Sequence, residues 1–316
     1  MAMNKRGVFF SMIAILLVGT LIYSINIYQG YKLRERSAII ESRINAMNNF
    51  LIDIDNDIER GLYISGYRAL FNTINYITEI RGDYIGDANE TFCELLLNGT
   101  YLGNHSNGGF MFNNTFMNWS ERMVAQADAM DMDLKITINN VRLFQENPWK
   151  VSVEINASIS LIDHRNTANW TTHKLVDAEI SILDFEDPVY AIETSGDVSN
   201  YFRRTNNTDF VDDDNNTGVL NEHNKQMYYV NNSLAPSFLK RLEGDFSSDP
   251  NGIESLVYLP DIWTEGIKLY NKSVIDYIYF EDSYPEDSDN FIKDMPNWFK
   301  IDDNHLDLYE VSGLVE

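Results

Sequence analysis

Cysteine is almost absent from this chain, since Cys93 is the one cysteine among 316 residues. A single thiol cannot form an intramolecular disulfide, so the fold must be held by core packing. The same scarcity excludes a disulfide scaffold and a cysteine-based zinc site. We expect Cys93 to be a buried, unreactive thiol, with pairing between two chains as the alternative.

Basic residues are scarce as well. The chain has 24 Lys and Arg against 48 Asp and Glu, a net charge of −24. Residues 1–36 carry five basic residues against Glu35, which is +4, so the remainder carries −24 − 4 = −28. A body this acidic repels phosphate backbones, which argues against nucleic acid as a partner. An apolar fraction of 44% and an aromatic fraction of 13% nevertheless indicate a folded protein.

Catalytic and metal-binding motifs are missing from the sequence. It contains no His-Glu-x-x-His, no Gly-x-Ser-x-Gly, no phosphate-binding glycine loop and no kinase signature. The histidines show no ligand spacing; they are His105, His164, His173, His223 and His305. We therefore predict a protein that is not an enzyme and has no cofactor or metal.

Two acidic patterns partly resemble calcium loops. Asp53–Glu59 alternates acidic residues but lies within a helical pattern and lacks the turn glycine. Asp212–Gly218 matches the first half of a loop, yet its twelfth position is Asn224 rather than Glu. We interpret both as solvated acidic surface.

Charge is missing altogether from residues 8–28. This apolar stretch is long enough to cross a bilayer as a helix. Tyr23 and Tyr28 lie near its far end, where aromatic rings favour the membrane interface. No Ala-x-Ala-like cleavage site follows before Arg34, so we expect the segment to be retained as a single-pass anchor in the cell membrane.

The first residues resemble the leader of a type IV prepilin, the archaeal class III type in particular. Lys5-Arg6-Gly7 is followed directly by the apolar run that starts at Val8. The resemblance implies cleavage between Gly7 and Val8, and an apolar helix that first anchors the protein and later packs in a filament core. It also implies membrane lipid, and like subunits or other pilin-like proteins, as partners of this helix. Met12 occupies the fifth mature position, where bacterial pilins usually carry Glu.

The segment that follows reads as an amphipathic stalk. Apolar residues recur at helical spacing on one face: Ile40, Ile44, Met47, Leu51, Ile54, Ile58 and Leu62. No proline occurs before Pro148, and Gly61 and Gly66 are the only weak points. We expect one long helix, or a broken pair, over about 31–80. Packing on its own body is favoured over a coiled coil with a partner helix.

Asn-x-Ser/Thr sequons are frequent after the stalk. They start at Asn89, Asn98, Asn104, Asn113, Asn118, Asn156, Asn169, Asn206, Asn215, Asn231 and Asn271. Several arise by chance in an Asn-rich chain, but the surplus indicates exposure to N-glycosylation. Because the basic charges flanking the anchor are nearly balanced, the sequons decide the orientation: a cytoplasmic N-terminus and an extracellular body. Residues 89–118 read as an irregular exposed loop.

Hydrophobic periodicity changes to two between Asp133 and Asp184. Three alternating runs separated by polar turns predict an antiparallel meander. Asp187-Pro188 ends it, because proline cannot continue a ladder. Beyond an Asn- and Asp-rich stretch, we expect a helix near 237–242 and a strand at 273–280.

The predicted fold class is therefore α+β: an N-terminal transmembrane helix that continues into a long amphipathic helix, then a pilin-like antiparallel β-sheet ectodomain with a C-terminal α+β extension. The helix-then-sheet order is also the pilin layout. The predicted segments are a leader (1–7), a transmembrane helix (8–28), a stalk (29–82), a β-rich ectodomain (83–193), an acidic linker (194–222) and a C-terminal region (223–316).

These features predict a membrane-anchored structural protein of the cell surface, pilin-like or minor-pilin-like. The alternative is an anchored adhesin or ligand-binding ectodomain that does not polymerise. A third possibility, a body that faces the cytosol, predicts sequons without glycans.

Overall fold

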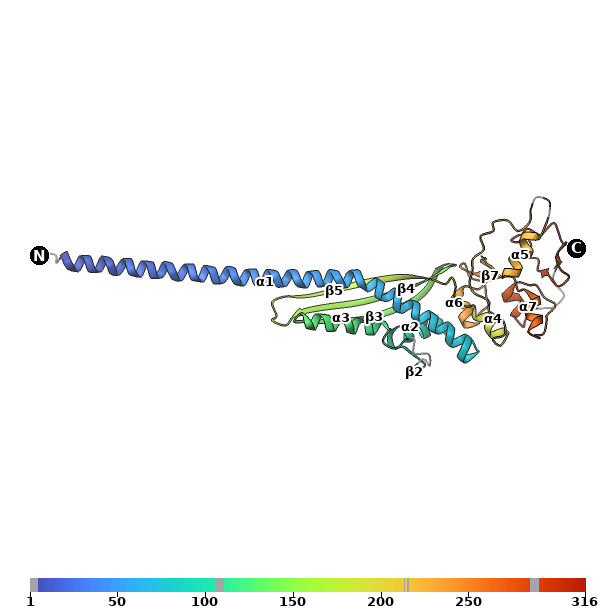
Figure 1. Ribbon diagram of the computed structural model, residues 1–316, viewed down its shortest axis with the longest axis horizontal. Helices are drawn as coiled ribbons and strands as arrows, with labels where there is room; N and C mark the ends of the chain where they lie inside the picture. The colour runs from blue at the N-terminus through green and yellow to red at the C-terminus, as the bar shows by residue number, and fades with distance from the viewer. Residues whose placement is uncertain (1–4, 106–110, 213, 215, 285–289) are drawn as a thin grey trace.

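The longest element of the protein is a single helix, α1 (Lys5–Asn75, 71 residues). The computed structural model describes residues 5–105, 111–212, 214, 216–284 and 290–316. In it, α1 begins at one end of an elongated molecule, and the C-terminal region lies at the other (Figure 1). No proline interrupts the hydrogen-bond ladder of α1. The predicted continuity between the apolar segment and the stalk is therefore confirmed.

α1 ends in a short π-helix, η1 (Tyr76–Arg81), and a left-handed glycine. Gly82 has a φ of 63°, and its N–H donates to the carbonyl of Ile77 at 2.9 Å. A glycine adopts this conformation without steric cost, so it can close the helix and turn the chain.

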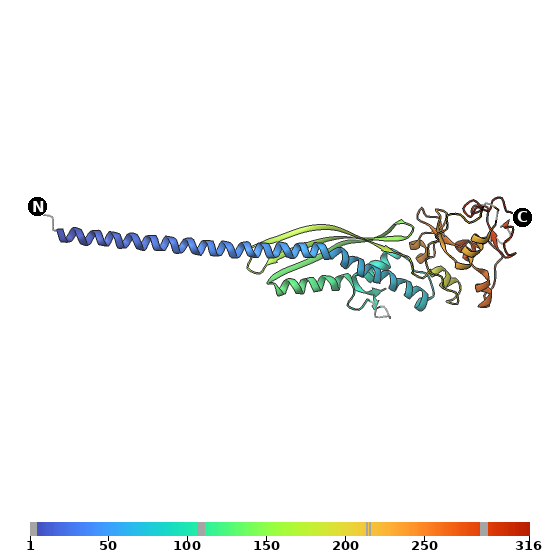
Figure 2. The same ribbon diagram turned by 45° about the horizontal axis from the view of Figure 1, so that its top comes forward.

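Three long strands form the main sheet. They are β3 (Met132–Asn147), β4 (Lys150–Asp163) and β5 (Asn169–Ser181), antiparallel in the order β3-β4-β5 (Figure 2). Leu161 of β4 pairs with Leu134 on one side and Trp170 on the other. Every second β4 side chain from Val151 to Leu161 is buried. The predicted meander is confirmed.

Two helices occupy much of the region that was predicted to be an irregular loop. They are α2 (Ala88–Asn98) and α3 (Phe116–Ala129), so the prediction for 89–118 is wrong over α2 and the start of α3. Between them lies a small antiparallel pair, β1 (Thr100–Tyr101) and β2 (Asn104–His105).

Helix caps explain why these helices form within a Gly- and Asn-rich stretch. The Asp87 side chain accepts the N–H of Glu90, and Gly99, with a φ of 69°, closes α2. Thr115 and Asn118 form a reciprocal capping box at the start of α3. Each such cap stabilises a helix by about 1 kcal/mol, which offsets poor helix formers at the ends.

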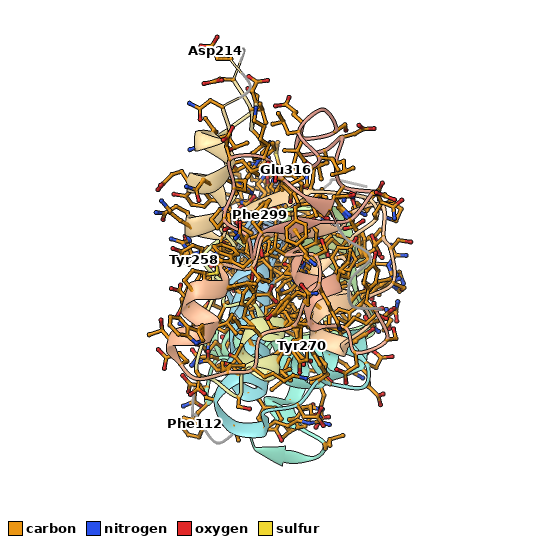
Figure 3. The ribbon with its side chains drawn as sticks, turned by 90° about the vertical axis from the view of Figure 1, so that its right-hand side faces the viewer. Phe112, Asp214, Tyr258, Tyr270, Phe299 and Glu316 are labelled. Carbon is orange, nitrogen blue, oxygen red and sulfur yellow. The ribbon has the colours of Figure 1, made fainter. Side chains whose placement is uncertain are left out.

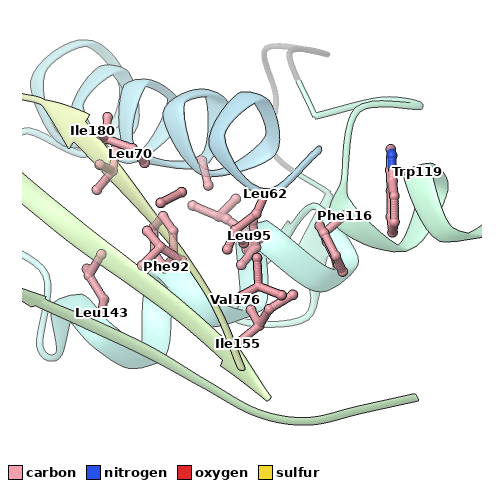
Figure 4. Close-up of a cluster of buried hydrophobic side chains, with 14 of the residues drawn as sticks. Leu62, Leu70, Phe92, Leu95, Phe116, Trp119, Leu143, Ile155, Val176 and Ile180 are labelled. Atoms are coloured by element: carbon pink, nitrogen blue, oxygen red, sulfur yellow. The ribbon is translucent and has the colours of Figure 1, made fainter. Parts of the chain in front are cut away.

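The main core lies between the sheet and these helices (Figure 4). The buried stripe of α1 starts at Met47 and continues through Ile54, Leu62 and Leu70, and Ile77 of η1 extends it. It meets Phe92 and Leu95 of α2 and the inner residues of β4 and β5. Burial of one such side chain contributes about 1.5–3 kcal/mol. The expectation that the stalk packs on its own body is confirmed from Met47 onward.

Two glycines in the packed half of α1, Gly61 and Gly66, are sites of close approach. A Cβ on Gly61 would lie 2.8 Å from Nε1 of Trp119, and one on Gly66 would lie 2.8 Å from Cδ1 of Ile180. The missing side chains therefore let α3 and the sheet approach the helix.

The C-terminal region forms a second core from short elements. They are α4 (Pro188–Glu193), α5 (Gly218–Gln226), β6 (Tyr229–Asn231), α6 (Phe238–Glu243), β7 (Ile253–Ser255), α7 (Leu259–Thr264), α8 (Asp276–Phe280), β8 (Asn290–Phe291) and β9 (Lys300–Ile301). β6 pairs with β7, and β8 with β9. Figure 3 looks onto this end, with the buried Phe299 near its centre. The helix predicted near 237–242 is confirmed as α6, with Ser237 at its N-cap.

The strand predicted at 273–280 is wrong, because residues 276–280 form helix α8 and Ile275 makes only an isolated bridge to Leu256. The N–H of Tyr279 donates to the carbonyl of Ile275 at 2.7 Å, and the N–H of Tyr277 donates to Asp276 Oδ1 at 2.7 Å. All residues of α8 are buried. A short run that is apolar on every side has no periodicity that separates a strand from a helix.

The segment predicted as a linker, 194–222, packs onto both cores. Phe202 belongs to the main core, whereas Val198 and Phe210 belong to the second. The C-terminal region also contacts the helical body near η1, where the N–H of Ile85 donates to Leu242 O of α6 at 3.1 Å, and both residues belong to the main core. The N–H of Ala88 donates to Glu243 Oε1 at 2.7 Å. The C-terminal region is therefore attached to the helical body.

Candidate functional site: the exposed N-terminal helix

The first half of α1 is apolar and exposed. Large apolar side chains from Phe9 to Leu33 are mostly uncovered, and Ile15 is 73% exposed. Met47 is the first buried side chain among those described in the helix. Apolar surface in water costs about 25 cal/mol per Å², so this segment needs an apolar environment or partner.

Among the described residues, one helix is long and apolar enough to cross a membrane. At 1.5 Å per residue, residues 8–28 extend for roughly 30 Å, which is the thickness of a bilayer's hydrocarbon core.

A neck, residues 29–46, joins this segment to the body. Ile40 and Ile44 continue the core-facing stripe beyond the end of the body, and they are exposed there. A groove of about 560 Å³ lies where the neck meets the β4–β5 turn. Its lining consists of α1 residues between Glu35 and Ala46 together with Arg165 and Thr167.

The body is fixed to the neck by a buried carboxylate. Arg43 Nε donates to Asp163 Oδ1 at 2.6 Å, and Arg43 Nη2 donates to Asp131 O at 2.5 Å. Thr167 also donates its hydroxyl to Asp163. The Thr167 and Arg43 hydrogen bonds lower the pKa of Asp163 to about 2. Sequence reasoning missed this contact, because Arg43 and Asp163 are 120 residues apart.

The predicted processing position lies at the start of α1. Gly7 and Val8 both belong to the helix, and Gly7 is exposed with no atom within 4 Å of where a Cβ would lie. The side chain of Val8 lies outside the described set. Cleavage between Gly7 and Val8 stays a prediction.

Most sequon asparagines that the structure describes lie on the surface. The exposed ones are Asn89, Asn98, Asn113, Asn156, Asn169, Asn206, Asn231 and Asn271. Asn118 is half-buried in the α3 capping box. The side chain of Asn104 and the whole of Asn215 lie outside the described residues. Their use by a glycosylation machinery stays a prediction.

The remaining candidate residues are scattered. Cys93 is half-buried, and burial, followed by the charge of Asp87, raises the pKa of its thiol to about 11, which makes it a poor nucleophile. His164 contacts Asp133 at 3.1 Å, and His173 contacts Ser158 at 2.9 Å.

The two calcium-like patterns also lie apart. In the first pattern, which lies on α1, Asp55 pairs with Lys174 of β5 at 2.8 Å, and Asp57 accepts the indole N–H of Trp119 of α3 at 2.9 Å. In the 212–218 segment, Asp212 Oδ1 accepts the N–H of Asp214 and of Asn216. No described group of three or more His, Cys, Asp or Glu residues is arranged to hold a metal.

A charged network that the sequence did not reveal is buried in the second core. Arg241 is inaccessible; its guanidinium donates to Asp187 at 2.6 Å and to Asp276 at 2.9 Å. Tyr229 donates its hydroxyl to Asp187 at 2.6 Å. These groups have no solvent access, so we interpret the network as structural: removing one member would leave a buried charge unpaired.

The chain matches no family model, no curated protein sequence and no solved structure. The order of its elements, a long apolar helix followed by an antiparallel sheet, is compatible with the pilin-like order.

Proposed function

We propose that this protein is a non-enzymatic, membrane-anchored structural component of the cell surface, pilin-like or minor-pilin-like. One observation carries the proposal. A single uninterrupted helix has an exposed apolar half and a half that forms the spine of a folded body. Such a helix fixes the body at a set distance from whatever covers its apolar end.

Two environments can cover the apolar half in turn. A bilayer covers it in the isolated subunit, because residues 8–28 match the hydrocarbon thickness. Like helices cover it in a filament or surface assembly. In the family that the chain resembles, cleavage of the class III leader, here after Gly7, converts the membrane-anchored subunit into one that can enter a filament.

The proposed orientation places the N-terminus in the cytoplasm and the body outside the cell. The exposed sequon asparagines support it, because an N-glycosylation machinery acts on extracytoplasmic segments. A glycan on any of them excludes the cytosol-facing alternative.

Mass spectrometry of the mature amino terminus in the native host tests the proposal. A terminus at Val8 is expected, together with filaments in micrographs of the native surface. A terminus at Met1 or Ala2 contradicts the pilin-like processing.

An anchored adhesin is the second candidate, and one observation favours it. On α7, in the region farthest from the N-terminus (Figure 1), Trp263 is 71% exposed, and Leu269 nearby in the chain is 40% exposed. Exposed large apolar side chains are frequent in binding surfaces. Cell-surface binding that is lost with Trp263→Ala, without filaments, would favour the adhesin.

A further inference from the structure

Three basic residues encircle α1 just above the proposed membrane span. Lys32, Arg34 and Arg36 are exposed, and no described carboxylate forms an ion pair with them. At 100° per residue, Lys32 and Arg36 lie on one side of the helix and Arg34 on the opposite side. We call these three residues the collar.

We propose that the collar binds the anionic headgroups of the membrane leaflet from which the body emerges. This inference rests on the proposed function, because it requires residues 8–28 to span the membrane. A ring of charge suits a headgroup layer that surrounds the helix, whereas a protein partner would meet one side only.

The axial positions agree with a headgroup layer. Lys32 lies about 6 Å and Arg36 about 12 Å beyond Tyr28, at 1.5 Å per residue. The polar layer of one leaflet is about 5–8 Å thick, and long basic side chains extend several ångströms along the helix. Tyr28 and Tyr31, which are 66% and 68% exposed, stand where aromatic rings favour the interface.

The neck keeps the acidic body away from the anionic headgroups that the collar binds. The body carries most of the −28 outside residues 1–36 and would be repelled by an anionic surface. The first hydrogen bonds described between the body and this helix are those of Arg43, about 22 Å beyond Tyr28, whereas the Debye length is about 8 Å at physiological salt. The headgroups therefore meet the collar at close range, while the acidic body stands beyond the screening distance.

The experiment is native mass spectrometry of the full chain in mixed micelles with equimolar phosphatidylglycerol and phosphatidylcholine. Each basic residue near an anionic surface contributes about a five-fold preference. Offset by Glu35, the collar is expected to favour retained phosphatidylglycerol between about five-fold and 25-fold. The triple variant Lys32→Gln, Arg34→Gln, Arg36→Gln should retain the two lipids equally.

A matched variant, Lys135→Gln, Lys225→Gln, Lys293→Gln, removes the same charge from exposed positions on the body and should keep the preference. Equal retention by the unaltered chain, or a preference that survives in the collar variant, overturns the proposal. Loss of self-association in the collar variant with an unchanged lipid preference assigns the collar to a second copy and also overturns it.

Carbonate washing of reconstituted vesicles separates this proposal from the anchoring proposal. A chain that resists the wash but shows no lipid preference leaves the anchor intact and removes the collar inference. A chain that washes off removes the membrane span, and the collar inference falls with it.

Discussion

At the scale of single residues, we expect substitution of Arg241 to cost the protein more stability than the other substitutions discussed. Arg241 is the cation of a fully buried cluster, with Asp187 and Asp276 as its partners. Arg241→Met leaves two carboxylates buried without a counter-charge, so we expect a loss of about 3–5 kcal/mol. Urea unfolding of the protein measures it.

The neighbouring Lys240 provides the control. Its ammonium lies 3.8 Å from Asp245 and donates to Ser247 and Ser248 at a part-exposed site, so Lys240→Met should cost about 1 kcal/mol. A second substitution, Asp276→Asn, should recover part of the stability in the Arg241→Met background. Equal losses of stability in Arg241→Met and Lys240→Met would contradict the structural role assigned to the buried Arg241 cluster.

His305 should make stability fall at alkaline pH. Burial by itself lowers its pKa, but Asp302 at 2.8 Å and Glu254 at 3.2 Å outweigh burial and raise the pKa to about 10. Because the folded pKa exceeds the unfolded value of about 6.5, the contribution is complete below pH 6.5. It is lost as pH rises from about 6.5 to 10, by at most about 1.4 kcal/mol per pH unit.

Denaturation at pH 6.5, 8 and 9.5 checks this slope, and His305→Gln should flatten it. The hydroxyl of Tyr277 also faces His305, at 3.0 Å, and burial raises the pKa of Tyr277 beyond this window. A slope that persists in His305→Gln would place the titrating group elsewhere.

At the scale of elements, the contact of α1 with α3 depends on Gly61. A Cβ there would lie within 2.9 Å of three atoms of the Trp119 ring, which is buried and held by Asp57. Gly61→Ala gains about 1 kcal/mol of helix propensity, but overpacking costs about 1–3 kcal/mol. We expect net destabilisation by thermal unfolding.

Gly66→Ala is the matched substitution one and a half turns later. Its new Cβ would meet the end of the flexible Ile180 side chain, which can rotate away. Its effect should therefore be closer to neutral, and a larger loss at Gly66 than at Gly61 would show that the sheet contact is the tighter one.

Some of the helices and strands were predictable from the sequence alone, and others were not. α1 and the meander were predictable because their periods of 3.6 and 2 persist over long segments. α2 was missed because the Asn- and Gly-rich residues after it suggested a loop, although Phe92, Leu95 and Leu96 lie at helical spacing within it. Local signals existed in Asp87-x-x-Glu90 and Thr115-x-x-Asn118, which are capping patterns.

Other features had no local signal at all. The Arg43–Asp163 pair and the Arg241 cluster join residues that lie far apart in the chain, so no spacing rule announces them. Of the candidate site, the apolar helix and its flanking charges were readable from sequence. The point at which burial of α1 begins, Met47, was not, because the stripe of α1 continues unchanged through Ile40 and Ile44.

At the scale of the whole molecule, charge and hydrophobicity are separated along one axis. The apolar and basic end of α1 lies at the opposite end of the molecule from the C-terminal region (Figure 1). The excess of acidic residues lies after residue 36, in the stalk, the sheet body and the C-terminal region. A monomer in water exposes the apolar end, whereas the body has two closed cores. Anchoring and folding should therefore be separable at the neck.

Truncation tests this separation. A fragment of residues 41–316 keeps Arg43 and every buried residue of α1, so it should purify without detergent as a folded monomer in light scattering. A fragment of residues 83–316 loses the stripe from Met47 to Ile77, and each large buried side chain removed from a core contributes about 1.5–3 kcal/mol. The combined loss from all the side chains of the stripe is as large as the stability of about 5–15 kcal/mol that a whole domain usually has. The main core should therefore not form in the shorter fragment. Aggregation of the longer fragment, or cooperative unfolding of the shorter one with an intact sheet, would show that α1 is not the spine that joins anchor and body.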